Sequence, residues 1–226
     1  MPRVIDLSQP LSRASQLHRF FPPTQILRHI VHADAAPGTP SFNAEIIITS
    51  NHAATHVDAF GHYDKQGEPI ADMPLETFCG EALCVDIRRY GRGHDVTAAE
   101  VEEAVAETAQ PLREGDILLF CSDHYNRTEG TPAFLDGFCG ISADAVHWMA
   151  DGSVKIFGVE TISPDLVYLT DEYPTHKACA ERRVTHFENL NNLKEVVGRR
   201  FQFFGFPLRL ETAYGSPVRA VGIVED

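Results

Sequence analysis

The stretch from His52 to His62 (HAATHVDAFGH) carries three imidazoles and one carboxylate, with mostly small residues between them. Neutral imidazole and carboxylate are the usual protein ligands of zinc and related divalent ions. If residues 55–58 are extended, the period of two turns His56 and Asp58 to the same side, where both can reach one ion. The pattern predicts a metal site with an acid or base beside it. A polar loop that collects histidines without function is the alternative, and this clustering disfavours it.

Further ligands are expected elsewhere, because this stretch alone leaves a divalent ion incompletely held. The best candidates are His176, which follows Tyr173 and Pro174, and Glu188. An apolar and amide-rich run follows Glu188, and a carboxylate in such a structured segment needs a partner. His186 competes for the role of ligand, since alternation along a strand places it on the same face as Glu188. It could equally hydrogen-bond a ligand without touching the ion.

Other histidines and the cysteines carry weaker signals. His94, His124 and His147 have no comparable neighbours, and surface or structural roles are predicted for them. The five cysteines are odd in number and form no C-x-x-C pair, which argues against a disulfide framework or a zinc knuckle. Buried thiols are predicted instead. Cys179 lies three residues after His176, a spacing that could serve a metal on a helix, but packing is the preferred interpretation.

Length and composition limit what surrounds the site. A chain of 226 residues with 43% hydrophobic residues can bury a core, and no linker, repeat or low-complexity run divides it. We therefore predict one domain over residues 1–226. The net charge of −13 argues against a nucleic-acid partner, because phosphate binding needs clustered Lys and Arg. Neither a signal-peptide pattern nor a membrane-spanning apolar run is present, which predicts a cytoplasmic protein without a membrane partner.

The elements that must position these residues alternate in type. Apolar and β-branched runs predict short strands at residues 44–49, 82–87, 116–121 and 154–159. The last two are nearly continuous in apolar residues and are predicted to be central in a sheet. The first runs directly into the histidine cluster.

Two helices are predicted between these strands. Residues 97–100 (TAAE) form a capping box that opens an amphipathic helix through about Glu107, with Val101 and Val105 on one face. Residues 142–150 predict a second helix that Gly152 closes. Helices alternating with strands indicate an α/β class. The ends of the chain, at 201–206 and 218–224, look like β structure broken up by Pro207, Gly215 and Pro217.

The His52 to His62 stretch resembles the H-x-G-T-H-x-D-x-P-x-H signature of the cyclase-like metal-dependent hydrolases, the family of kynurenine formamidase and isatin hydrolase. Further landmarks of the resemblance span most of the chain: Ile5-Asp6-Leu7-Ser8, Ser163-Pro164-Asp165, the twelve-residue separation of His176 and Glu188, and Glu188-Asn189-Leu190.

The resemblance implies roles for particular residues. The implied metal ligands are His52, His56, Asp58, His176 and Glu188, with Asp58 and Glu188 able to bridge two ions. His62 is implied as the proton donor and acceptor. The family further implies a swivelling β/β/α fold with a mixed sheet, one or two zinc or manganese ions, and a homodimer or higher homo-oligomer.

Two departures from the signature matter. Ala54 stands where the family has Gly, a change that is harmless unless φ is positive. Ala59-Phe60-Gly61 replaces the segment in which the family has Pro, and Phe60 and Gly61 could reshape the wall of the substrate site. These departures bear on the substrate more than on the chemistry.

The residue types favour hydrolysis by a metal-activated water, with His62 transferring the proton. The predicted function is a metal-dependent amidohydrolase acting on a small non-peptide substrate, an aryl formamide or a cyclic amide. Phe20 and Phe21 could pack on an aromatic substrate, although ordinary core or interface roles would explain each of them too. A metal-assisted cyclase or lyase (dehydratase) is the alternative. A non-catalytic binding protein is disfavoured, because binding alone does not need His62.

Overall fold

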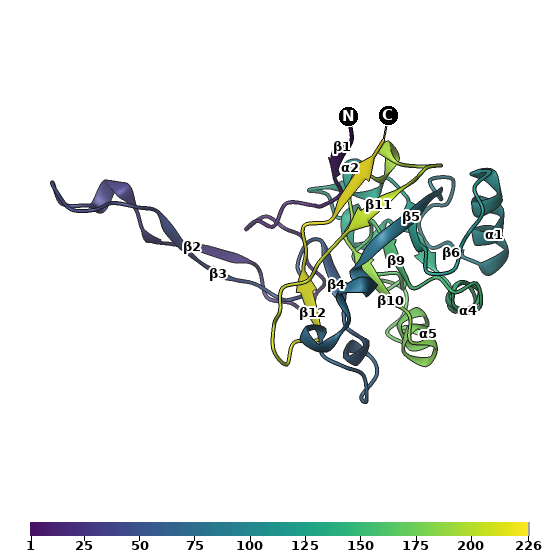
Figure 1. Ribbon diagram of the computed structural model, residues 1–226. Coiled ribbons are helices and arrows are strands. Elements are labelled where there is room, and N and C mark those ends of the chain that lie inside the picture. The colour runs from purple at the N-terminus through teal and green to yellow at the C-terminus, as the bar shows by residue number, and fades with distance from the viewer. Residues whose placement is uncertain (226) are drawn as a thin grey trace.

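The computed structural model describes residues 1–225 and is built on a nine-stranded mixed sheet with helices along one side (Figure 1). The strands are β1 (Arg3–Asp6), β2 (Gln25–Ile30), β3 (Ala44–Ile48), β4 (His56–Asp58), β5 (Cys79–Asp86), β6 (Asp95–Val96), β7 (Ile117–Cys121), β8 (Gly140–Ile141), β9 (Ile156–Val159), β10 (Thr185–Glu188), β11 (Arg200–Phe204), β12 (Gly215–Pro217) and β13 (Val221–Val224). The α-helices are α1 (Ala98–Glu107), α2 (His124–Thr128), α3 (Ala133–Asp136), α4 (Ala143–Asp151) and α5 (Pro174–Arg182). The 3-10 helices are η1 (His32–Asp34), η2 (Phe60–His62), η3 (Ile70–Asp72), η4 (Leu75–Phe78) and η5 (Leu193–Glu195).

The strand order across the large sheet is β1-β13-β11-β5-β7-β9-β10-β4-β12. The four strands β5, β7, β9 and β10 run parallel in the middle, and antiparallel strands flank them on both sides. The two continuous apolar runs were expected to be central, and β7 and β9 do lie in the middle of the sheet. Every residue of β7 is buried, as a strand covered on both faces requires. The predicted mixed sheet is confirmed.

Both faces of the sheet are covered. Successive strand residues point to opposite faces, so each strand contributes side chains to two cores. On one face, Leu83 and Phe120 join a core with residues of α1, α4 and α5. On the other face, Cys84 and Leu119 pack in a second core that includes Phe203 of β11. The sheet curls as its antiparallel strands close over this second core (Figure 1).

Local signals placed the two predicted helices correctly. The Thr97 hydroxyl accepts from the Glu100 amide while the Glu100 carboxylate accepts from the Thr97 amide, so the capping box is formed. Val101 and Val105 are buried as expected. The helix α4 begins after Ser142, whose hydroxyl caps it, and ends at Gly152.

The strands β2 and β3 form a hairpin arm that projects away from the rest of the chain (Figure 1). No residue of either strand is buried, and Ile46, Ile47 and Ile48 are 45%, 59% and 52% exposed. Three consecutive isoleucines put apolar side chains on both faces of the ribbon. A two-stranded ribbon of this kind is marginally stable alone in water.

The expectation that Gly215 and Pro217 interrupt β structure is wrong. They begin and end β12, which pairs with β4 at the edge of the sheet. An edge strand tolerates proline, because a missing N–H there costs no ladder hydrogen bond inside the sheet.

The cysteines follow the prediction of buried thiols except for Cys79, which is half-exposed, and all five are free. Within residues 1–225, no helix has both the length and the apolar character that crossing a membrane requires.

Candidate metal centre

The strand β4 carries His56 and Asp58 and lies between β10 and β12. Antiparallel pairing sets His56 opposite Glu188 of β10 and Asp58 opposite Gly215 of β12. Side chains of directly opposed residues share a face of the sheet, so the Glu188 carboxylate lies beside the His56 ring. The extended conformation predicted for residues 55–58 is confirmed over His56–Asp58, which fixes both side chains on one side.

A first group of potential ligands comes from the segment that precedes β4 and from β4 itself. His52 Nδ1 lies 2.8 Å from Asp58 Oδ1, and His56 Nε2 lies 3.5 Å from the same oxygen. All three side chains are buried. These atoms are close enough together to surround one cation.

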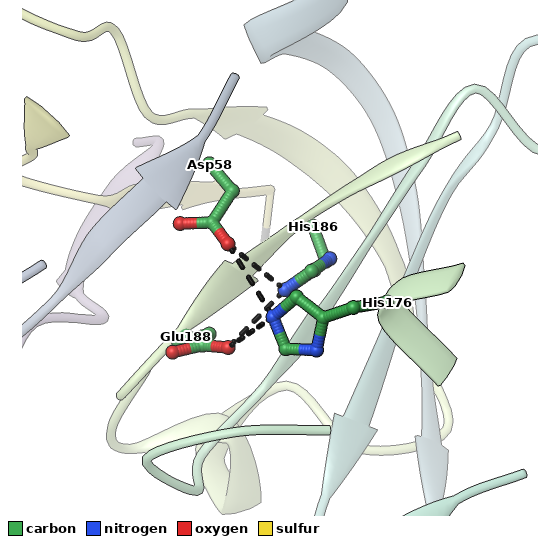
Figure 2. Close-up of side chains that lie close together, drawn as sticks. All are labelled: Asp58, His176, His186 and Glu188. Carbon is green, nitrogen blue, oxygen red and sulfur yellow. Dashed lines mark hydrogen bonds and ion pairs between the residues drawn. The ribbon is translucent and has the colours of Figure 1, made fainter. Parts of the chain in front are cut away.

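A second group shares Asp58 with the first and adds α5 and β10 (Figure 2). His176 Nε2 lies 3.6 Å from Asp58 Oδ2 and 3.6 Å from Glu188 Oε1. His186 Nε2 lies 3.4 Å from Asp58 Oδ2 and 3.2 Å from Glu188 Oε1. The structure thus brings together all five residues that the resemblance implied as ligands, and places His186 among them.

Two of the rings are aimed by hydrogen bonds at Nδ1, which leave Nε2 facing the cluster. His56 Nδ1 lies 2.8 Å from the Ala54 carbonyl oxygen, and His176 Nδ1 lies 2.5 Å from Asp165 Oδ2. Such contacts fix the tautomer and the orientation of a metal-binding imidazole. Asp165 also accepts from the amides of Thr175 and His176, at 2.7 and 3.1 Å. The resemblance had marked Asp165 without giving it a role.

Ala54 meets the condition under which its departure from the family glycine is not harmless. Its φ is +51°, in the left-handed region that glycine enters freely. The residue is buried, and its carbonyl oxygen is the acceptor for His56. The family glycine position is therefore a turn that aims a ligand ring, and alanine holds that turn under backbone strain.

Charge in the cluster is concentrated on two buried carboxylates. Burial opposes their ionisation, but the surrounding imidazoles outweigh it and hold the pKa of Asp58 well below its usual value. In the same way, burial opposes ionisation of Glu188, but the adjacent His186 and His56 rings outweigh it and lower its pKa to about 2. Burial alone would lower the pKa of His176, yet the Asp165 and Asp58 carboxylates raise it to about 10. Both carboxylates are therefore ionised near pH 7, next to the imidazoles that surround them.

His62 lies at the edge of this cluster on η2. Its Nε2 is 3.7 Å from Asp58 Oδ2, and its ring centroid is 4.3 Å from that of His52. Burial lowers the pKa of His62 to about 4, so its ring is neutral near pH 7 and can accept a proton. The side chain keeps 26% of its surface exposed, which gives it access to a bound molecule.

A cavity of ≈ 220 Å³ opens beside the cluster. Most of the residues that line it have aromatic rings. They are His18, Phe20, Phe21, His52, His62, Tyr63, Ile162, Ser163, Val167, Tyr173, His176 and Glu188. Phe21 stacks on His52 with ring centroids 5.4 Å apart, whereas the Phe20 side chain is largely exposed. Sequence reasoning had singled out the two phenylalanines but not His18, Tyr63 or Tyr173.

The three histidines predicted to have surface or structural roles lie away from the cluster. His94 pairs with Glu100 at 2.9 Å, buried His124 lies 3.0 Å from the Phe134 carbonyl oxygen, and His147 contacts Arg182. None belongs to either ligand group within residues 1–225. Cys179 is buried and its Sγ lies 3.8 Å from His186 Nδ1, behind the ring rather than in the cluster.

Two other features were missed. A Cβ on Gly215 would lie 2.7 Å from the His52 ring, so glycine is needed for that ring to pack against β12. The N-terminal landmark supports the end of β10, because Ser8 bridges to Leu190 and Asn191 donates to the Leu7 carbonyl. Both depend on contacts between residues far apart in the chain, for which the sequence offers no local signal.

Comparison with known proteins agrees with this geometry. The family model Cyclase, described as "Putative cyclase", matches residues 5–166. The chain is 30% identical over 221 residues to a kynurenine formamidase of Paracidovorax citrulli, with 97% of this chain and 96% of that protein covered. It is 28% identical over 218 residues to a kynurenine formamidase of Salinibacter ruber, with 96% of each covered. Isatin hydrolase A from Ralstonia solanacearum has the same fold, with a TM-score of 0.87 at 27% identity over 99% of this chain and 92% of that one. The chain therefore belongs to the cyclase family.

Proposed function

We propose that this protein is a metal-dependent hydrolase that cleaves a C–N amide bond in a small non-peptide substrate. The observation that carries the proposal is the pair of buried ligand groups sharing Asp58. His56 Nε2 and Asp58 Oδ1 are buried and make no well-directed hydrogen bond within residues 1–225, although His52 Nδ1 lies 2.8 Å from that oxygen. Such atoms are costly unless another group contacts them. A divalent cation would do so, and imidazole with carboxylate is a suitable donor set.

The proposed ligands are the five residues that the family resemblance implied, and the distances allow them to hold two ions. His52, His56 and Asp58 would hold one ion, and Asp58, His176 and Glu188 a second. Glu188 can face both positions, because its Oε2 lies 3.2 Å from His56 Nε2 while its Oε1 lies 3.6 Å from His176 Nε2. We propose one or two ions, zinc or manganese, because both metals accept nitrogen and oxygen ligands.

A bound divalent ion would lower the pKa of a water molecule and polarise the substrate carbonyl. The residues of the chain do the rest. His62 lies at the edge of the cluster, with Nε2 3.7 Å from Asp58 Oδ2, and Nε2 would take the proton of the attacking water and return it to the leaving nitrogen. Asp58 and Glu188 stay ionised throughout, which keeps the proton on His62 during the transfer.

The substrate is proposed to be an aryl formamide such as N-formylkynurenine, or a cyclic amide such as isatin. The names of the kynurenine formamidases and of isatin hydrolase A support this class. Phe20 and Phe21 offer aromatic surface beside His62 in a cavity large enough for a compact planar molecule. The cyclase or lyase alternative is not favoured, since these relatives are named for hydrolysis.

We further propose that residues 1–226 act as one unit and that two copies pair through the β2–β3 arm. The ligands come from residues 52 to 188, and the N-terminal landmark supports β10, so no smaller part holds the site. The exposed isoleucines of the arm need a cover, and a second copy supplies the same surface by symmetry. Ile47→Lys should shift the mass measured by light scattering toward one chain. A parent protein that is already monomeric would contradict this arrangement.

The function is tested by Asp58→Ala and Glu188→Ala, with His94→Gln as the control. Metal content and amide hydrolysis should fall together in the first two variants, and His94→Gln should keep turnover within a few-fold of the parent. Formamides, lactams and cyclic imides serve as the substrate panel. Full metal occupancy in both carboxylate variants would refute the ligand assignment.

A further inference from the structure

We infer that His186 is itself a metal ligand, through Nε2, to the ion proposed for Asp58, His176 and Glu188. This inference rests on the proposed function and adds a fourth ligand to that site, the second from β10 after Glu188. The family signature implied only Glu188 on this strand. The spacing of the atoms and the orientation of the ring carry the argument.

The spacing fits ligands around an ion better than a hydrogen-bonded pair. Around a tetrahedral ion with bonds of about 2.1 Å, neighbouring ligand atoms lie about 3.4 Å apart. His186 Nε2 lies 3.4 Å from Asp58 Oδ2 and 3.2 Å from Glu188 Oε1. The corresponding distances of His176 Nε2 are both 3.6 Å. The 3.2 Å contact with Glu188 Oε1 is also a hydrogen bond, but it is longer than the about 2.7–2.9 Å of a charge-assisted pair, and the other three distances are longer still.

The ring of His186 is held so that Nε2 faces the ion position. Phe157 stacks on one side of it with ring centroids 5.2 Å apart, and the His176 ring meets it edge to face at 4.8 Å. Cys179 Sγ lies 3.8 Å from Nδ1, at the opposite edge from the cluster. Figure 2 shows the ring nitrogens of His176 and His186 directed toward the same point between the two carboxylates.

The alternative is that His186 only donates a hydrogen bond to Glu188. Two substitutions separate these roles, because Gln keeps a donor near the position of Nε2 whereas Glu offers an oxygen ligand and no donor. If His186 is a ligand, His186→Gln loses affinity for one ion and His186→Glu recovers part of it. If His186 only donates, the order reverses, since Glu would repel Glu188.

The experiment titrates chelator-treated protein with Zn²⁺ alone and with Co²⁺ alone, and measures stoichiometry, affinity and the Co²⁺ absorption spectrum. His147→Gln is the matched control, because this histidine contacts Arg182 away from the cluster. We expect His186→Gln to weaken one ion by more than about 100-fold, the upper range for loss of a supporting contact, and to change the Co²⁺ spectrum. The control should bind as the parent does.

Parental affinity and spectrum in His186→Gln, or tighter binding in His186→Gln than in His186→Glu, would overturn the inference. Melting temperatures of the metal-free variants show whether each is folded. If His186→Glu is unfolded, the affinity and spectrum of His186→Gln decide whether His186 is a ligand. Asp58→Ala keeps the two ideas apart. If Asp58→Ala loses metal while His186→Gln keeps it, only the role of His186 fails; if Asp58→Ala keeps its metal, the proposed function fails.

Discussion

Asp165 should control metal affinity without touching the metal. Its buried carboxylate accepts three hydrogen bonds, from the amides of Thr175 and His176 and from His176 Nδ1. Asp165→Asn leaves one oxygen to serve these donors and turns an amide NH₂ toward at least one of them. Where the NH₂ faces Nδ1, the ring must accept there, and the proton moves to Nε2. His176 then cannot offer Nε2 as a ligand.

The size of the effect follows from these contacts. Removing the carboxylate that orients a metal-binding histidine costs about 10- to 100-fold in affinity, which is about 1.4–2.7 kcal/mol. Loss of one buried charge-assisted hydrogen bond should lower the free energy of unfolding by about 1.5–3 kcal/mol. For a chain of this length, that corresponds to a drop in Tm of roughly 3–12 °C.

Calorimetric titration of metal-free protein with Zn²⁺ at pH 8, beside a thermal melt, measures both quantities. Asp144→Asn is the control, because Asp144 also accepts from a helix-terminal amide, that of Ala98, but lies away from the cluster. It should lose stability and keep its affinity for Zn²⁺. Equal Zn²⁺ affinity in Asp165→Asn and the parent, or the same loss of affinity in both variants, would refute the reasoning.

Three further predictions concern single side chains. His62→Ala should keep metal and Tm while lowering turnover by roughly 10²–10⁴-fold; loss of metal, measured by elemental analysis, would instead make His62 a ligand. Burial, then Asp165 and Asp144, raise the pKa of Asp95 to about 6, so the contribution of Asp95 to stability should fall as pH rises from 3.8 to 6. Asp95→Asn should lack this dependence and be the more stable form above pH 6; parallel denaturation profiles for the two proteins would contradict this. Gly215→Ala would place a Cβ 2.7 Å from the His52 ring and should weaken metal binding, whereas Gly91→Ala, with nothing within 4 Å, should not; equal Zn²⁺ affinities would count against this packing role.

The sequence predicted those parts of the fold whose causes are local. The capping box at Thr97 lies within four residues, and alternation along β4 needs only His56 and Asp58 themselves. The helix α5 shows the limit. Tyr173 begins it at φ +51° without a side-chain cap, and the missing acceptor is supplied by Asp165, which precedes Thr175 by ten residues. The sequence next to Tyr173 contains no capping pattern from which this helix could be predicted, because the capping carboxylate belongs to another segment.

The same distinction applies to the site. Alternation placed His186 on the face of Glu188, but face alone does not separate a ligand from a hydrogen-bond donor. That difference depends on the positions of His176 on α5 and Asp58 on β4 relative to His186, which are determined by the tertiary structure. The resemblance to the family implied five ligands. It gave no role to His186, because this histidine lies outside the family signature.

At Ala54 the local sequence and the fold act together. From the sequence we could predict that alanine in place of glycine matters only if φ is positive. The value of φ is known only from the structure, where it is +51°. Holding a non-glycine residue in the left-handed region costs roughly 1–2 kcal/mol, and the rest of the structure must offset this. The turn persists because the Ala54 carbonyl that it orients contacts His56 Nδ1, and rotating it away would release the ring. Backbone strain at this residue is therefore part of what aims His56 Nε2 at Asp58 and Glu188.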